Sequence, residues 1–225
     1  MRNTIFLILI MTSGLLYSQV GNENVSYSSG LFFTRANRPT TIEYKIDGTP
    51  FIEGKDFKKV IIKGYSSNVQ PLRYNAYEDE MEFDENGDIF YTEKQEGLII
   101  DFPTLNKKYQ CVRYSYLGRP YFGYLVLLSE GKQYNLYKRE KIELIEGLKS
   151  PSAYGKDEND YFSRMQDIYL FGNTEDGIVE LPNNRRKLVE FFTNINSDVP
   201  GFIKTNKLNL NKEPDLIKLV NYINS

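Results

Sequence analysis

The residues best suited to bind a metal ion stand in one acidic segment. Asp84, Asn86 and Asp88 occupy the first, third and fifth positions of a calcium-binding loop, whose oxygen ligands suit a hard cation. The pattern is incomplete, because Gly87 stands at the fourth position rather than the sixth, and Gln95 replaces the glutamate that closes such a loop. Alternating apolar and acidic residues lead into Asn86-Gly87, which is a preferred sequence for a type I′ turn. We therefore favour a β-hairpin over a calcium site and assign no metal ligand.

The residue types that the chain lacks exclude several catalytic mechanisms. Its 225 residues include no His and one Cys. A Ser-His-Asp triad, a Cys-His pair and a His-ligated metal or haem site are excluded, as are a cysteine-rich metal site and an internal disulfide. Carboxylate chemistry and a Ser/Lys pair remain, but no motif isolates two of the many acidic residues. We predict no catalytic residues and no cofactor, and we keep an exported hydrolase of this kind as the alternative function.

Tyrosine and phenylalanine are the unusual enrichment, with 18 and 14 residues and no Trp. Tyrosine offers a large contact area and a polar tip, so clustered tyrosines can form a binding face. Aromatic residues also favour strands and fill half-buried sheet surfaces, and this structural explanation is the simpler one. If a binding face is present, its candidate residues are Tyr74, Tyr77, Tyr114, Tyr116 and Tyr121.

We assign structural roles to three further residues within predicted strands, Cys111, Arg73 and Arg113. Cys111 is expected to be buried and unreactive, as most isolated cysteines are, because no activating charge stands beside it in the sequence. Arg73 and Arg113 have apolar and aromatic neighbours. We expect both guanidinium groups to stack on aromatic rings or to pair with acidic side chains.

The segment 31–148 shows the alternating and short apolar runs that are typical of strands, bounded by Gly, Pro and Asn. The spacing of its turn signals favours a mainly antiparallel meander, open barrel or sandwich over βαβ units. Hairpin turns are predicted at Asn86-Gly87 and at 129–132. The predicted strands are 40–45, 57–63, 70–77, 79–83, 89–93, 98–101, 108–116, 121–128 and 133–144.

The pattern changes twice in the last third of the chain. Gly, Ser, Pro and charged residues at 146–161 predict a loop, which a short β pair follows at 167–171 and 178–181. From residue 183 onward the apolar residues have helical spacing and predict three short helices. Their predicted N-caps are Asn183 or Asn184, Ser197 and Asn211.

The predicted fold class is therefore α+β. It consists of a mainly antiparallel β part followed by a small helical unit, and each short helix must pack on its neighbours or on the β part to persist. The predicted organisation is a signal peptide over 1–18, a β-rich domain over 19–148, a loop and short β pair over 149–182, and a helical C-terminal unit over 183–225.

Residues 1–18 have the features of a signal peptide: Arg2 is followed by an apolar run, and Ser18 is a small residue at the expected cleavage site. The apolar run is shorter than the roughly 20 residues that a membrane-spanning helix needs. Removing the segment removes one positive charge, so the net charge of -2 becomes -3, which is unsuited to electrostatic binding of nucleic acid. We expect a periplasmic or extracellular protein with no membrane span in the mature chain.

Three segments, 47–51, 71–83 and 206–222, resemble a family of exported proteins of Bacteroidota-type Gram-negative bacteria. The resemblance spans most of the mature chain. It implies a β-rich body with a short helical C-terminal unit, located in the periplasm or outside the cell. It implies no activity and no catalytic residue, so none is carried over to this sequence.

These observations together favour a non-catalytic binding or structural module of the cell envelope. We expect it to act through protein-protein or polymer contacts, with another envelope protein or a surface polymer as its partner. A second arrangement, in which the helical unit docks to the partner and the β part is a spacer, is left open.

Overall fold

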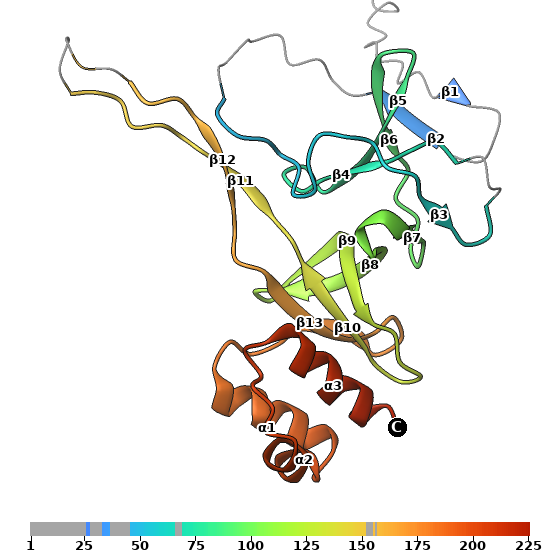
Figure 1. The fold of residues 1–225 in the computed structure, drawn as a ribbon, viewed down its shortest axis with the longest axis vertical. Coiled ribbons are helices and arrows are strands. Elements are labelled where there is room, and N and C mark those ends of the chain that lie inside the picture. Colours follow the sequence, from blue (N-terminus) through green and yellow to red (C-terminus); the bar gives the residue numbers. More distant parts are fainter. Residues whose placement is uncertain (1–25, 28–32, 37–45, 66–68, 152–154, 156) are drawn as a thin grey trace, which may run out of the picture.

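The structure is a computed structural model that describes residues 26–27, 33–36, 46–65, 69–151, 155 and 157–225. The predicted signal peptide and the predicted strand 40–45 lie outside the described residues. Within the described part, no helix is both long enough and apolar enough to cross a membrane. A β-rich body with antiparallel sheets is followed by C-terminal helices, which confirms the predicted α+β class (Figure 1).

Most strands of the described residues are short, whereas β8 and β9 have 10 and 11 residues. In chain order they are β1 (Ser26–Tyr27), β2 (Phe33–Ala36), β3 (Ile61–Ile62), β4 (Arg73–Asn75), β5 (Glu80–Glu85), β6 (Asp88–Thr92), β7 (Ile99–Phe102), β8 (Lys107–Tyr116), β9 (Arg119–Ser129), β10 (Asn135–Arg139), β11 (Ile142–Ile145), β12 (Tyr161–Arg164), β13 (Ile168–Asn173) and β14 (Gly177–Glu180).

Two sheets and one hairpin make up the β-rich body (Figure 1). One sheet is antiparallel and has the strand order β1-β2-β6-β5-β4. The other has the order β14-β13-β10-β9-β8-β7-β3, and a parallel pair between Val179 and Ser115 joins β14 back to β8. Strands β8, β9, β10, β13 and β14 therefore curve into a partial barrel, while β11 and β12 form a hairpin that extends away from it.

The long β8–β9 ribbon is buried on both faces. Tyr109, Cys111 and Tyr124 pack into the core between the ribbon and the five-stranded sheet. Val112 and Leu125 pack into the core of the partial barrel. Since successive residues of a strand point to opposite faces, one ribbon supplies both cores.

Cys111 is completely buried, as the sequence predicts. Burial raises the pKa of its thiol from 9.0 to about 12. Because the thiolate is the reactive form, the buried thiol is unreactive at neutral pH.

Both predicted hairpins are present. Asn86 and Gly87 have φ values of 58° and 93°, and they form the turn between β5 and β6. Asp84, which the calcium pattern would use as a ligand, instead accepts a hydrogen bond from the Gly87 N–H at 3.1 Å. The second hairpin joins β9 to β10, where Leu136 pairs with Ser129.

The predicted strand 133–144 is in fact two strands. β10 ends at Arg139 and β11 begins at Ile142. Between them Glu140 is buried, and the chain leaves the partial barrel to enter the β11–β12 hairpin (Figure 1). β12 has no counterpart among the predicted strands, because its sequence carries no clear alternation of apolar and polar residues.

Two other predicted strands, 57–63 and 70–77, are much shorter in the structure, where only β3 and β4 remain. The two segments also meet at an isolated bridge, in which Lys58 and Leu72 exchange two backbone hydrogen bonds of 2.8 Å. The backbone around this bridge does not continue as a ladder, so the apolar pattern there reflects burial of single residues such as Leu72.

The two strand arginines have the predicted structural roles. The Arg73 guanidinium lies 4.1 Å from the centre of the Phe51 ring, and its Nε lies 2.6 Å from a carboxylate oxygen of Glu82. The Arg113 guanidinium lies 4.8 Å from the centre of the Phe122 ring. Both arginines thus stack on aromatic rings, which shields part of the guanidinium from water.

The helical unit covers one side of the partial barrel (Figure 1). Its helices are α1 (Arg185–Ile195), α2 (Val199–Thr205) and α3 (Glu213–Ile223). Their apolar residues share a core with Leu136 of β10 and Phe171 of β13. Asn221 of α3 accepts a hydrogen bond from the Ser129 hydroxyl at 2.6 Å, which fixes the last helix to the end of β9.

One of the predicted helix caps is confirmed. The Asn184 side chain accepts hydrogen bonds from the backbone of Arg186 and Lys187 at the start of α1. The other two predicted caps, Ser197 and Asn211, are wrong by one residue, because the N-caps are Asp198 and Lys212 without side-chain hydrogen bonds.

Candidate functional site

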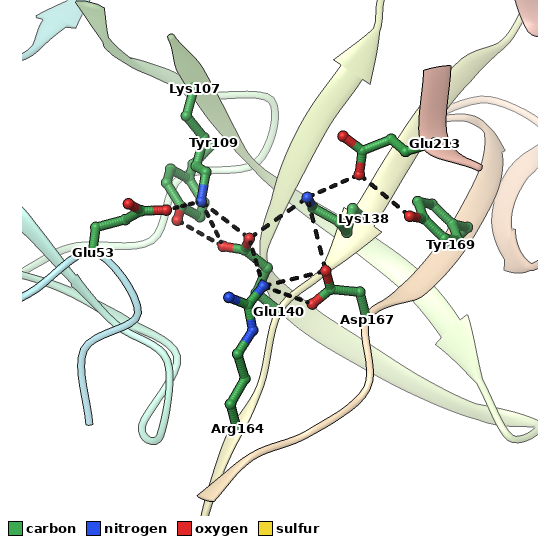
Figure 2. A network of polar contacts seen from close by, with 9 residues as sticks. All are labelled: Glu53, Lys107, Tyr109, Lys138, Glu140, Arg164, Asp167, Tyr169 and Glu213. Atoms are coloured by element: carbon green, nitrogen blue, oxygen red, sulfur yellow. Dashed lines mark hydrogen bonds and ion pairs between the residues drawn. The ribbon is translucent and has the colours of Figure 1, made fainter. Parts of the chain in front are cut away.

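The buried carboxylate of Glu140 is the centre of an extended charged network (Figure 2). Its side chain is 1% exposed. Lys107 Nζ lies 3.0 Å from Oε1, and the Tyr109 hydroxyl donates to Oε2 at 3.0 Å. Lys138 Nζ at 3.7 Å and Arg164 Nη2 at 3.6 Å also approach Oε1. Burial of a carboxylate is unfavourable unless cations and donors replace its water in this way.

The network reaches three further segments of the chain. Lys138 Nζ lies 2.9 Å from Glu213 of α3, and Arg164 Nη2 lies 3.1 Å from Asp167, which precedes β13. Glu53 pairs with the lysine that begins β8. Burial lowers the pKa of Lys138, but its hydrogen bond to Glu213 and the nearby carboxylates outweigh that effect and raise the pKa. The network therefore joins the partial barrel, the β11–β12 hairpin and the helical unit.

The residues beside Glu140 differ in what they contact. Lys138 and Glu140 point into the charged network, whereas Arg139 and Lys141 lie over tyrosine rings. We call this region the tyrosine surface, and it consists of Tyr77, Tyr114, Tyr116, Tyr121, Arg139 and Lys141.

The first half of the tyrosine surface is an aromatic stack at one end of the barrel core. Tyr114 and Tyr121 are stacked with ring centres 5.5 Å apart. The Arg139 guanidinium lies 4.7 Å from the centre of the Tyr116 ring and 5.8 Å from that of Tyr121. Tyr114 belongs to the barrel core, and burial, followed by the charge of Asp79, raises its pKa. The buried ring thus provides a fixed base for the exposed one.

The second half of the tyrosine surface is built on Lys141. Its Nζ donates a hydrogen bond to the backbone carbonyl of Tyr77 and lies 5.6 Å from the centre of the Tyr77 ring. The other contact of that ring is an edge-on packing against Phe162 of β12, at 5.3 Å. The β11–β12 hairpin therefore supports this half of the surface.

Asp79 lies near both halves, because its charge affects the pKa of Tyr114 and that of Lys141. Its Oδ1 accepts hydrogen bonds from the Tyr74 hydroxyl at 2.8 Å and from the Tyr124 backbone N–H at 3.1 Å. Its Oδ2 lies 3.5 Å from Lys94 Nζ. Asp79 has a φ of 60°, and its carboxylate rests on Gly123, where an added Cβ would meet Oδ2 at 1.8 Å. The position thus requires both a left-handed backbone and a glycine opposite.

The titratable groups of this region are shifted by burial and by one another. Burial raises the pKa of Asp79, although Lys94 and the hydrogen bond from Tyr74 oppose the shift. Burial lowers the pKa of Lys141, and the neighbouring charge of Arg139 lowers it further. Shifted groups of this kind gather at binding and catalytic sites. Asp79 is already hydrogen-bonded through both oxygens, so its direct effect is to hold the loop that carries Tyr77.

The structure brings four of the five tyrosines predicted as a binding face into the tyrosine surface. Tyr77 and Tyr121 are 36% and 37% exposed, and Tyr116 is half-buried. Tyr114 is 7% exposed and stacks on Tyr121. Tyr74 is also 7% exposed, but its ring packs on Tyr109 and Tyr124 in the other core, so it is not part of the surface.

The charged members of the site were not predicted from the sequence. Arg139 and Lys141 flank Glu140 in a predicted strand, and an acidic residue between two basic ones in such a strand places the charges on opposite faces. That pattern could have identified both cations. Asp79 carries no comparable signal, because its role depends on Gly123, which is far away in the sequence.

Among the described residues, no three His, Cys, Asp or Glu side chains are placed to hold a metal ion. No family model, no curated protein and no solved structure matches the chain. The candidate site therefore rests on its own geometry.

We expect Glu140→Gln to lower the free energy of unfolding by about 3 kcal/mol, because it leaves three converging cations without their buried counter-charge. Denaturant unfolding measures the change. Glu143→Gln, an exposed acid on β11, is the control, with an expected change within about 0.5 kcal/mol. Equal stabilities of the two variants would show that the network does not hold the fold.

We expect Gly123→Ala to lower the free energy of unfolding by about 1–3 kcal/mol, because the new Cβ displaces the Asp79 carboxylate. In an Asp79→Gly background, which also accepts the positive φ, the same substitution should cost less than half as much. A double-mutant cycle from denaturant unfolding tests this coupling. An equal cost in both backgrounds would contradict the contact.

Proposed function

We propose that the protein is an exported, non-catalytic binding module of the cell envelope that acts through the tyrosine surface. The observation that carries the proposal is the meeting of part-exposed tyrosines with Arg139 and Lys141. Neither cation has an ion-pair partner among the described residues, although Arg139 contacts Tyr114 and Lys141 contacts a backbone carbonyl. Charged groups placed in this way favour contact with another molecule.

The residue types support a binding role. Tyrosine and arginine are enriched at protein interfaces, where tyrosine provides a large contact area at low entropic cost and arginine stacks on rings while donating hydrogen bonds. The stacked base of Tyr114 and the edge contact with Phe162 hold the exposed rings in place before a partner arrives. Preorganisation of this kind lowers the entropic cost of binding.

The signal-peptide pattern of residues 1–18 and the family resemblance support export. The expected partners are another envelope protein or a surface polymer. N-terminal sequencing of the protein purified from the periplasm or the medium checks the location and the cleavage after Ser18.

We expect a Tyr77→Ser, Tyr121→Ser double variant to capture at least tenfold less of a specific partner from envelope fractions, because both exposed rings are removed. The control is Tyr161→Ser, which removes a tyrosine that is 42% exposed on β12 and lies outside the tyrosine surface. Quantitative pull-down at physiological salt measures capture, and thermal melting verifies folding. Unchanged capture by the double variant would refute the role of this surface.

A hydrolase is the second candidate, because Asp79 has a raised pKa and Lys141 a lowered one. If the binding role is correct, the purified protein should not hydrolyse a panel of chromogenic esters and glycosides. Turnover that Asp79→Asn removes and Glu143→Gln keeps would instead support the hydrolase.

A further inference from the structure

We propose that the tyrosine surface docks a short acidic segment of a partner protein, with Arg139 and Lys141 binding its carboxylates and Leu117 contacting an apolar residue beside them. This inference rests on the proposed binding function and names the chemistry of the partner.

Arg139 is arranged to receive a carboxylate. Its guanidinium lies over the Tyr116 ring and approaches that of Tyr121. It also forms a side-chain hydrogen bond with Tyr114. A guanidinium has five N–H donors, so this bond leaves others for an incoming carboxylate. Arginine binds carboxylates through parallel N–H donors along that edge. The ring contacts also restrict the side chain, which lowers the entropic cost of forming a fork with an incoming acid.

Lys141 supplies the second positive charge. It uses one N–H for the Tyr77 carbonyl and forms no ion pair with any described residue. Asp79 and Glu143 attract it only at longer range, while Arg139 repels it. A carboxylate placed between the two cations would offset their mutual repulsion.

Two acids close to these cations are engaged by other groups. Glu140 points away into the charged network, where it contacts Lys107 and Lys138. The carboxylate of Asp79 is engaged by Lys94 and by its two hydrogen-bond donors. Glu143 is exposed and attracts Lys141 only at longer range. An external acid can therefore pair directly with Arg139 and Lys141.

Leu117 provides an independent observation at the turn of the β8–β9 hairpin, next to Tyr116. It has a φ of 50° and is followed by Gly118 with a φ of 71°, which places it where a type I′ turn favours Asn. Its side chain is 72% exposed. A bulky side chain in a left-handed conformation costs about 1–2 kcal/mol, and this one buries little in return. Strain of this kind gathers at functional sites.

The surroundings favour a short protein segment over a long anionic polymer. The positive region is small, because Lys94, the other cation near Lys141, is paired with Asp79 and Glu80. Glu143 also lies near Lys141, and Glu78 follows Tyr77 in the chain. A long polyanion would meet these acids, and the whole chain has a net charge of -2. An apolar residue at Leu117 also suits a peptide side chain.

The test uses the full folded chain and a panel of short synthetic peptides in which glutamates surround one leucine. Titration calorimetry should detect binding that weakens when the glutamates are replaced by glutamine. Raising the salt from about 0.15 M to about 1 M shortens the screening length from about 8 Å to about 3 Å and should weaken it further.

We expect Arg139→Gln to weaken peptide binding by about tenfold and Lys141→Gln by several-fold. The matched controls are Arg185→Gln at the exposed start of α1 and Lys132→Gln in the β9–β10 loop, and both should leave binding unchanged. Leu117→Asn should weaken binding while keeping or raising the melting temperature, because Asn suits the turn. That combination separates a contact residue from a structural one.

Three results would overturn the inference: no binding by any peptide at about 1 mM, equal binding of glutamate and glutamine peptides, or tighter binding of polygalacturonate than of any peptide. Capture that is sensitive to the tyrosine double variant but not to Arg139→Gln would preserve the binding function and remove only the acidic partner. Capture that neither the tyrosine double variant nor Arg139→Gln changes would remove the two proposals together.

Discussion

The buried carboxylate of Glu140 is the interaction on which the arrangement of the other parts depends. It lies where three structural units meet: the partial barrel, the β11–β12 hairpin and the helical unit. A carboxylate out of water needs cations, and Lys107, Lys138 and Arg164 come to it from separate strands. The ionic contacts therefore add to the apolar contacts between these units, such as the core that the helices share with Leu136 and Phe171.

The same residue links the fold to the candidate site. Glu140 is directed into the charged network at the break between β10 and β11, and its neighbours Arg139 and Lys141 lie over tyrosines from β8, β9 and the loop before β5. The β8–β9 ribbon contributes similarly, because its two faces supply two cores and its end supplies Tyr116 and Tyr121. The exposed residues of the site are thus held in place by contacts that are mostly buried.

Two residues near this surface, Asp79 and Leu117, adopt left-handed backbone conformations. Aspartate tolerates this conformation better than leucine does. Asp79 tolerates its φ of 60° and gains hydrogen bonds from Tyr74 and Tyr124. Leu117 has a φ of 50° with an exposed side chain. The first is explained by folding, because its contacts compensate its conformation. The proposed partner, which would contact the leucine, accounts for the second.

The sequence alone determined the features that depend on neighbouring residues. Alternation identified most strands, Asn86-Gly87 predicted the hairpin, and Asn184 predicted the start of α1, because turns and caps depend on local chemistry. It also singled out five tyrosines, but it did not place them together. Only the tertiary structure divided the segment 133–144 at Glu140 and brought Tyr77, Tyr121 and Arg139 to one surface. Those contacts join residues far apart in the chain, and their energies depend on burial and on charges that no local pattern records.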